Sequence, residues 1–320
     1  MKMNLSKMMF KMMMATSVIM SISSNNIMFT WMSMEINLIS FLPLMKKSNK
    51  MNEQSMKYLI IQSVSSSMML MSMIINLIIN HPVNESMLMM MGILTKMGMM
   101  PFHLWLPSTM QMMSWNTCMM MMTIQKIIPT VMATQMISMK LMMTPMIMSM
   151  IISPVTGMKQ TSMKKIMAYS SITNSPMMIM ALYLSKQQFL IYFSMYSMIN
   201  LMMMNTLKKN NLNFINQINT QQNLTKLSLL ISTLSMSGMP PMTGFLMKWM
   251  IIKSSMTLTI LFPMMMIVSS ILSTFLYLNM MLPTMTKTMK MKLKLKKNES
   301  IVPMILNLIG IPIMMISKIN

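Results

Sequence analysis

Four ionisable side chains stand inside stretches of sequence that are otherwise apolar: Glu35, Lys96, Lys126 and Lys248. At the centre of a bilayer each such group costs ~2.5–3.5 kcal/mol on insertion scales. In a chain that needed only apolar anchoring, apolar residues would replace these charged side chains. The four residues are therefore candidate functional groups. Burial disfavours the charged form of lysine, whereas a neighbouring carboxylate favours it. A lysine that gains and loses Glu35 as its partner can therefore bind and release a proton near neutral pH.

The first of these lysines is followed by residues that interrupt a helix. Lys96 precedes Gly98, Pro101 and His103 in the segment Lys96-Met-Gly-Met-Met-Pro-Phe-His103. Proline removes an amide donor and clashes with the preceding helical turn. Irregular backbone at membrane depth survives only where it is buried in protein or lines a wet cavity. We predict a helix break at Pro101, with a simple proline kink as the alternative. His103 is either a proton relay or a packed histidine.

A second break is predicted ahead of Lys248. The segment from Ser237 to Gly244 contains the double proline Pro240-Pro241, which no continuous helix accommodates easily. Discontinuous helices beside ionisable residues are a feature of ion transporters. The two breaks and the buried charges therefore favour transport of an ion or a proton.

The composition places these residues in a membrane. The 320 residues are 54% hydrophobic and 9% charged, whereas a soluble domain carries about 25% charged residues. Such hydrophobicity excludes intrinsic disorder. Because Cys118 is the only cysteine, a disulfide framework and cysteine-based zinc or iron–sulfur sites are excluded. A polytopic helical membrane protein remains, with no metal or cofactor site in this chain.

The net charge of +22 is the balance of 26 lysines and 4 glutamates, because the chain has no arginine and no aspartate. Nucleic-acid readers depend on arginine, so we expect no nucleic-acid partner and assign the lysine clusters to anionic lipid headgroups. The 68 methionines suit Cu(I) in principle. Their spread through every apolar run instead indicates codon drift in a mitochondrial genetic code, with methionine serving as a flexible hydrophobic residue.

Hydropathy predicts an all-α protein with about eleven membrane spans of ~20 residues. The spans are 3–24, 26–45, 58–79, 86–107, 113–136, 141–156, 163–184, 188–207, 226–252, 257–282 and 300–317. The connections are short, so we predict a single transmembrane domain over 1–320 and no extramembrane domain.

Lysine positions support an odd number of spans. With this segmentation, one side, called side A, carries the N-terminus and nineteen of the 26 lysines. These are Lys2, Lys7, Lys11, Lys46, Lys47, Lys50, Lys57, Lys159, Lys164, Lys165, Lys208, Lys209, Lys226, Lys287, Lys290, Lys292, Lys294, Lys296 and Lys297. The opposite side, side B, receives Lys140, Lys186, Lys253 and Lys318. This asymmetry is the positive-inside pattern.

Five motifs together resemble the NADH dehydrogenase subunit 2 family, the mitochondrially encoded, antiporter-like subunits of respiratory complex I. The motifs are Met34-Glu35-Ile-Asn, Lys96-Met-Gly-Met-Met-Pro-Phe-His-Leu-Trp-Leu-Pro, Gln125-Lys126-Ile-Ile-Pro, Lys164-Lys165-Ile-Met-Ala-Tyr-Ser-Ser and Gly238-Met-Pro-Pro-Met-Thr-Gly-Phe-Leu-Met-Lys-Trp. The resemblance covers essentially the whole chain and is closest to the short animal form.

The resemblance implies roles for the four buried charges. Glu35 matches a carboxylate that pairs with a lysine on the first broken helix, here Lys96. Lys126 matches the central lysine of the proton path, and Lys248 the lysine on the second broken helix. The implied fold has two inverted repeats of five helices. Two positions depart from the family pattern: Ser108 replaces an acidic residue, and Asn174 stands where histidine is common.

The resemblance further implies a core membrane-arm subunit of proton-pumping NADH:ubiquinone oxidoreductase. Flavin, iron–sulfur clusters, NADH and ubiquinone would belong to partner subunits. The partners would include neighbouring antiporter-like subunits and membrane lipids, cardiolipin among them. The location would be the mitochondrial inner membrane, with the N-terminus in the matrix and the C-terminus in the intermembrane space. A free-standing cation/proton antiporter and a purely structural membrane spacer remain as alternatives.

Overall fold

The computed structural model describes residues 5–45, 49–79, 82–221, 223–240 and 242–286. Within these residues the regular structure is helical, and the one extended pairing is an isolated bridge between Ser162 and Phe214. The predicted all-α class is therefore confirmed. The predicted last span, 300–317, and Pro241 lie outside the described residues.

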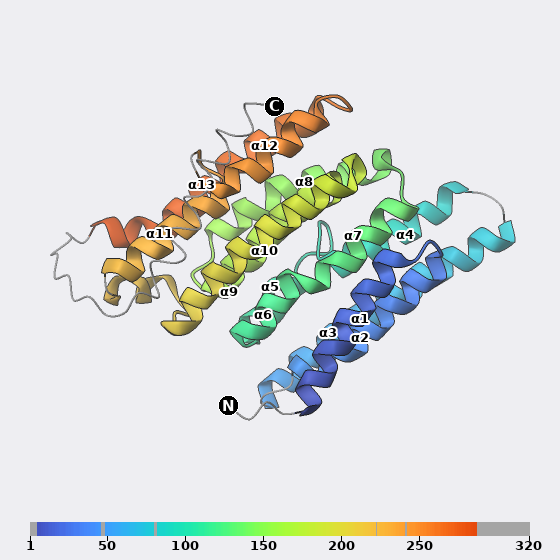
Figure 1. Ribbon diagram of the computed structural model, residues 1–320, viewed down its shortest axis with the longest axis horizontal. Coiled ribbons are helices and arrows are strands. Elements are labelled where there is room, and N and C mark those ends of the chain that lie inside the picture. Colours follow the sequence, from blue (N-terminus) through green and yellow to red (C-terminus); the bar gives the residue numbers. More distant parts are fainter. Residues whose placement is uncertain (1–4, 46–48, 80–81, 222, 241, 287–320) are drawn as a thin grey trace. The chain divides into compact units, whose positions relative to one another are not determined.

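The helices follow one another along the chain as shown in Figure 1. They are α1 (Leu5–Ser23), α2 (Ile27–Met45), α3 (Asn49–Ile79), α4 (Pro82–Met97), α5 (Trp105–Met112), α6 (Trp115–Met122), α7 (Ile124–Met136), α8 (Met139–Met158), α9 (Met163–Leu184), α10 (Lys186–Lys209), the 3₁₀ helix η1 (Ile215–Thr220), α11 (Asn223–Ser237), α12 (Thr243–Ser255) and α13 (Leu261–Thr286). The chain divides into two compact units, Met1–Ser149 and Met150–Asn320. The division falls within α8.

Five of the described helices are long and apolar enough to cross a membrane: α1, α2, most of α3, α8 and most of α13. α9 and α10 have 22 and 24 residues but carry more polar side chains. Other predicted spans are divided between two shorter helices, as 86–107 is between α4 and α5. The count of eleven and the single transmembrane domain therefore stay predictions.

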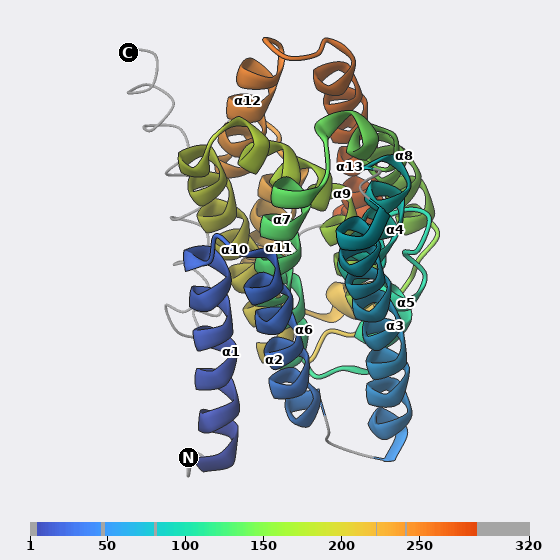
Figure 2. The ribbon, with the colours of Figure 1, turned by 90° about the vertical axis from the view of Figure 1, so that its right-hand side faces the viewer.

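In the first unit the helices pack as neighbouring pairs. α1 lies against α2, and α3 lies against α4, as Figure 2 shows. α7 contacts α1, α2 and α4, and α5 contacts α3. This packing brings α2, α3, α4 and α7 around a common interior, which is where the first group of predicted site residues lies.

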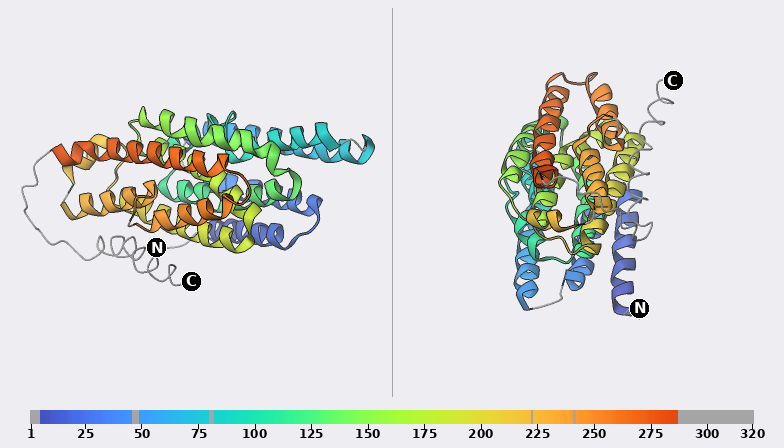
Figure 3. Two further views of the ribbon diagram at one scale, coloured as in Figure 1. Left: turned by 90° about the horizontal axis from the view of Figure 1, so that it is seen from above. Right: turned by 90° about the vertical axis from the view of Figure 1, so that its left-hand side faces the viewer.

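In the second unit α10 has the central position. It contacts α9, α11 and α12, and α13 packs against α11 and α12. Figure 3 shows these helices, coloured from yellow-green to red, running alongside one another. α9 is buried at every residue from Ile166 to Ala181 although many of its side chains are polar. Its hydroxyls donate to carbonyls three or four residues earlier, as Ser170 does to Met167, which makes burial tolerable.

Both broken helices end in the same backbone motif. At the end of α4, Gly98 has φ +66°, its N–H donates to Thr95 O at 3.2 Å, and the N–H of Met99 donates to Leu94 O at 3.0 Å. This is a Schellman motif, in which glycine supplies the left-handed conformation. Pro101 follows in the non-helical segment before α5.

The end of α11 repeats that arrangement. Gly238 has φ +80° and bonds to Ser235 O at 3.1 Å, and Met239 bonds to Leu234 O at 3.3 Å. Pro240 lies in the connection to α12. In both places the glycine terminates the helix and the proline follows in the loop, so the break begins earlier than the prolines alone predict.

A third break was not predicted. The expected span 113–136 is divided at Thr123, where φ is −112° and ψ is −83°, between α6 and α7. The Thr123 hydroxyl donates to Met119 O at 2.8 Å, and the amide of Lys126 donates to Thr123 O at 3.1 Å. Pro129 lies inside α7 and cannot donate to the carbonyl four residues earlier. The α6–α7 junction therefore lies one turn before Lys126.

Replacing Gly98 with alanine should destabilise the first unit. A side chain at positive φ costs about 1–2 kcal/mol, and an added Cβ would lie 2.8 Å from Leu106 Cδ1. We expect the thermal unfolding temperature of the assembled protein to fall. Ser194→Ala, at an exposed position of α10, is the control and should leave that temperature unchanged. Equal temperatures for Gly98→Ala and the control would contradict the assigned strain.

Candidate functional site

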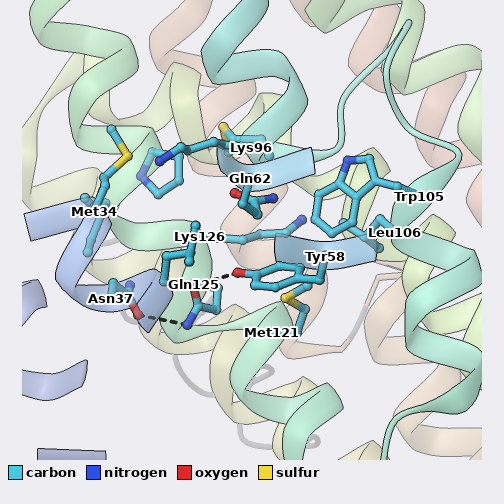
Figure 4. Close-up of a pocket in the computed structure, with 14 residues that line it drawn as sticks. Met34, Asn37, Tyr58, Gln62, Lys96, Trp105, Leu106, Met121, Gln125 and Lys126 are labelled. Carbon is cyan, nitrogen blue, oxygen red and sulfur yellow. Dashed lines mark hydrogen bonds between the residues drawn. The ribbon is translucent and has the colours of Figure 1, made fainter. Parts of the chain in front are cut away.

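A cavity of about 30 Å³ in the first unit contains two of the predicted lysines (Figure 4). Lys96 comes from the last turn of α4 and Lys126 from the first turn of α7. The lining residues are Met34, Asn37, Leu38, Tyr58, Gln62, Lys96, Met97, Trp105, Leu106, Met121, Gln125, Lys126, Ile128 and Pro129. A pocket with amide, phenol and ammonium groups among apolar walls suits water and protons better than an apolar ligand.

Lys96 forms an ion pair with Glu35 of α2. Its Nζ lies 3.8 Å from Glu35 Oε1, and the two side chains are 4% and 28% exposed. Glu35 Oε1 is itself buried and forms no hydrogen bond. A separation of 3.8 Å is too long for a hydrogen bond, so the carboxylate stabilises the ammonium without sharing its proton. Of the three lysines that the residue pattern left open as partners, the structure brings Lys96 to Glu35.

Lys126 is buried in the same cavity, with 4% of its surface exposed. In Figure 4 its side chain extends across the cavity between Gln62 and Tyr58, toward Trp105. Trp105 is fixed by a 3.0 Å hydrogen bond from its Nε1 to Thr95 O, in the last turn of α4. Lys126 therefore lies beside polar groups of α3 and next to the broken end of the helix that carries Lys96.

A set of amide and phenol hydrogen bonds holds one wall of this cavity. Gln125 Nε2 donates to Asn37 Oδ1 at 2.8 Å, and Tyr58 Oη lies 3.5 Å from Gln125 Oε1 (Figure 4). These contacts tie α2, α3 and α7 together next to Lys126. They fix the orientation of Gln125. Lys126, the next residue, is therefore held on a rigid turn of α7.

The second unit contains a separate, small cavity of about 10 Å³ around Lys248 of α12. Its lining residues are Pro154, Ser170, Thr173, Asn174, Met177, Met236, Lys248, Ser269, Ser273, Leu276 and Tyr277. Lys248 is 4% exposed, donates from Nζ to the carbonyl of Ser237, and lies 3.5 Å from Ser273 Oγ. Ser237 is the last residue of α11, so the ammonium lies at a helix C-terminus, where a positive charge is favoured.

Gly238 serves this site as well as the helix end. A Cβ at that position would lie 2.8 Å from Lys248 Cδ and 3.0 Å from Nζ. The glycine therefore provides both the left-handed turn and the space for the lysine. This explains why the glycine and the lysine occur together in one short segment.

His103 lies apart from both groups of lining residues. It is half-buried in the segment between α4 and α5, and its Nδ1 is 3.2 Å from Pro101 O. A relay role for His103 therefore stays a prediction. Among the described residues, no group of three or more His, Cys, Asp or Glu side chains could hold a metal ion.

Several cavity residues were not identified from the sequence. Tyr58, Gln62 and Tyr277 line the two cavities, and Ser237 and Ser273 contact Lys248. Gln62 is a lone amide in an apolar run and gave a usable signal. The serines gave none, because serine is common throughout these helices and most hydroxyls bond to their own helix.

A family model described as "NADH:quinone oxidoreductase/Mrp antiporter, TM" matches residues 24–84 and 80–275. NADH-ubiquinone oxidoreductase chain 2 of Locusta migratoria is 38% identical over 245 residues, which cover 73% of this chain and 72% of the relative.

Two solved assemblies contain chains with a similar fold. One is respiratory complex I from Thermus thermophilus with bound aureothin, with a TM-score of 0.82, 17% identity, and coverage of 96% of this chain and 78% of that chain. The other is the Mrp complex from Dietzia sp. DQ12-45-1b, with a TM-score of 0.70, 14% identity, and coverage of 85% and 59%. At these identities the likeness concerns the fold alone.

Proposed function

Because the chain belongs to the NADH:quinone oxidoreductase/Mrp antiporter family of membrane subunits, we propose that it carries protons through the membrane arm of NADH:ubiquinone oxidoreductase. Glu35, Lys96, Lys126 and Lys248 are the groups that bind and release them. The reduction of ubiquinone by NADH takes place in other subunits and drives the movement of protons here.

The observation that carries this proposal is the placement of three buried lysines in polar cavities. Lys96, Lys126 and Lys248 are each less than 10% exposed. Each lies within a few residues of a helix break. Broken helices expose carbonyls and leave room for water, which a proton needs to reach a buried side chain. A structural spacer would gain nothing from these costly groups.

The geometry suggests how each lysine works. Glu35 stabilises the charged form of Lys96 at 3.8 Å, and a small increase in that distance favours release of the proton. Lys126 lies in the same cavity and can receive a proton through water or polar side chains. The charged Nζ of Lys248 donates a hydrogen bond to the carbonyl of Ser237 at the end of α11. A conformational change that moves these helix ends would alter proton affinity.

The proposal also covers the partners of the chain, its location and orientation in the membrane, and its bound lipid. The partners are other membrane-arm subunits, including neighbouring antiporter-like subunits, and flavin, iron–sulfur clusters, NADH and ubiquinone are bound by partners. The chain forms one transmembrane domain of the mitochondrial inner membrane. Side A faces the matrix with the N-terminus, and the C-terminus faces the intermembrane space. The lysines of side A bind anionic phospholipid such as cardiolipin.

A free-standing cation/proton antiporter is the second candidate, because the description of the family model names the Mrp antiporter as well as NADH:quinone oxidoreductase. The same buried charges would serve such an exchanger. The two candidates differ in the assembly that the chain requires. A free-standing antiporter exchanges a cation for protons without redox partners, whereas a membrane-arm subunit translocates protons only when coupled to a redox reaction.

Native separation of mitochondrial membranes in mild detergent distinguishes these candidates. We expect the chain to co-migrate with a large complex that stains for NADH dehydrogenase activity, as mass spectrometry of the band would show. The isolated, reconstituted chain should give no cation-dependent proton flux. A small band without redox partners, together with flux from the isolated chain, would favour the antiporter and contradict the proposal.

A further inference from the structure

A row of buried polar side chains follows one face of α10. Tyr192, Tyr196 and Asn200 are spaced by four residues, so they lie on the same face of the helix, and each is at most 1% exposed. The rings of Tyr192 and Tyr196 stack at 6.4 Å with an angle of 10°. The row extends about 12 Å along the helix axis. None of these residues is among the four charged residues that the proposed function uses.

The first member of the row contacts the Lys248 cavity. Tyr192 Oη donates to Asn174 Oδ1 at 3.2 Å, and Asn174 Nδ2 donates to Ser170 O at 2.8 Å. Asn174 and Ser170 both line the cavity that contains Lys248. Asn174 therefore links the cavity to α10.

The other members of the row have buried polar atoms without direct partners. Both polar atoms of the Asn200 side chain and the hydroxyls of Tyr196 and Tyr277 are buried and form no hydrogen bond within the protein. Yet the Tyr196 hydroxyl interacts with the Asn200 side chain and with the Tyr277 hydroxyl, so the three polar groups lie close together. Polar groups that are close together, buried and not directly bonded are the usual setting of bridging water. Tyr277 is itself part of the cavity wall.

The row has a direction. α10 ends at Lys208 and Lys209, which are exposed and which the positive-inside pattern assigns to the predicted side A. Asn200 is about 12 Å along the helix from Lys208. Met203, Met204 and Leu207 occupy the intervening turns and are fully buried. The polar row therefore leads from the cavity toward side A and stops at an apolar barrier two turns from the helix end.

We propose that Tyr196, Asn200 and Tyr277 hold a file of water molecules that extends the Lys248 cavity along α10 toward side A. The file is a branch for protons, and Met203, Met204 and Leu207 close it at its outer end. The inference rests on the proposed function, because it gives Lys248 a route for proton exchange. Tyr196 and Asn200 act as positioning residues for this water and need not change their own protonation.

Variants of the assembled complex in proteoliposomes test this branch. Asn200→Leu keeps the side-chain size and removes both polar groups, and we expect redox-driven proton translocation to fall about tenfold, as for the loss of one well-placed hydrogen-bonding group. Asn200→Ser keeps a polar group and should restore most of the rate. Asn205→Leu, an exposed position on the same helix, is the matched control and should equal the unmodified complex.

A second variant and a structural measurement keep the proposal open to refutation if Asn200→Leu fails to assemble. Tyr196→Phe removes only a hydroxyl and should slow translocation in the same direction. A high-resolution cryo-EM map of the unmodified complex should show ordered water between Tyr196, Asn200 and Tyr277. Normal translocation in both variants, or direct hydrogen bonds in place of water, would overturn the branch. If Lys126→Met blocks translocation in the same vesicles, the proposed function stands without the branch; if Lys126→Met translocates normally, the proposed role of Lys126 in the proton path fails as well.

Discussion

Replacing Lys126 with methionine is expected to lower NADH-driven proton translocation about tenfold or more, because positioned proton-transfer groups contribute factors of that size or larger. Methionine fills a similar length of cavity but has no ionisable group. It also removes the cost of a charged group in apolar surroundings, so assembly should be unaffected. The measurement is the rate of proton uptake in proteoliposomes, together with the rate of ubiquinone reduction by NADH.

The matched control is Lys140→Met. Lys140 is an exposed lysine of α8 in the same unit of the chain and lines neither cavity. The control should translocate protons at the normal rate. A Lys126→Met complex that assembles fully and also translocates normally would remove Lys126 from the proton path. A complex that fails to assemble would instead assign Lys126 a structural role.

The order and type of the helices could be predicted from the sequence because the apolar runs are long and are separated by lysine clusters. The predicted boundaries of α1, α2 and α9 agree with the structure to within about two residues. The break at Thr123 could not be predicted, since neither glycine nor proline occurs there. Gly98 and Gly238 were visible as glycines, but only the backbone shows that they, and not the prolines, end the helices.

The candidate site was predictable to the extent that its members are charged. Lys96 and Glu35 are conspicuous in an apolar sequence, and the structure brings them to 3.8 Å. Tyr58, Tyr277 and Ser273 are cavity residues that depend on which helix faces are brought together. Their positions follow from packing between helices far apart in sequence. A periodic pattern cannot reveal such contacts, because aromatic and hydroxyl side chains also occur on exposed helix faces, as Phe275 and Ser194 do.

The ion pair between Glu35 and Lys96 can be tested with a double-mutant cycle. Glu35→Gln leaves the Lys96 ammonium in a buried position without its carboxylate, and Lys96→Met leaves the buried Oε1 of Glu35 without its cation. Removing one partner of a fully buried pair costs about 3–5 kcal/mol. Because 28% of the Glu35 side chain is exposed, we expect a smaller loss, about 1–3 kcal/mol, for each single variant.

The double variant Glu35→Gln/Lys96→Met should be more stable than the sum of the single losses predicts, because neither charge is left unpaired. A coupling of about 0.5–3 kcal/mol in the unfolding free energy is expected for groups in contact. Proton translocation should not recover with stability, since no titratable pair remains. Additive losses of stability would show that the two charges do not interact. Recovery of translocation together with stability would mean that the pair serves only the fold, and that the proton passes through the cavity without it.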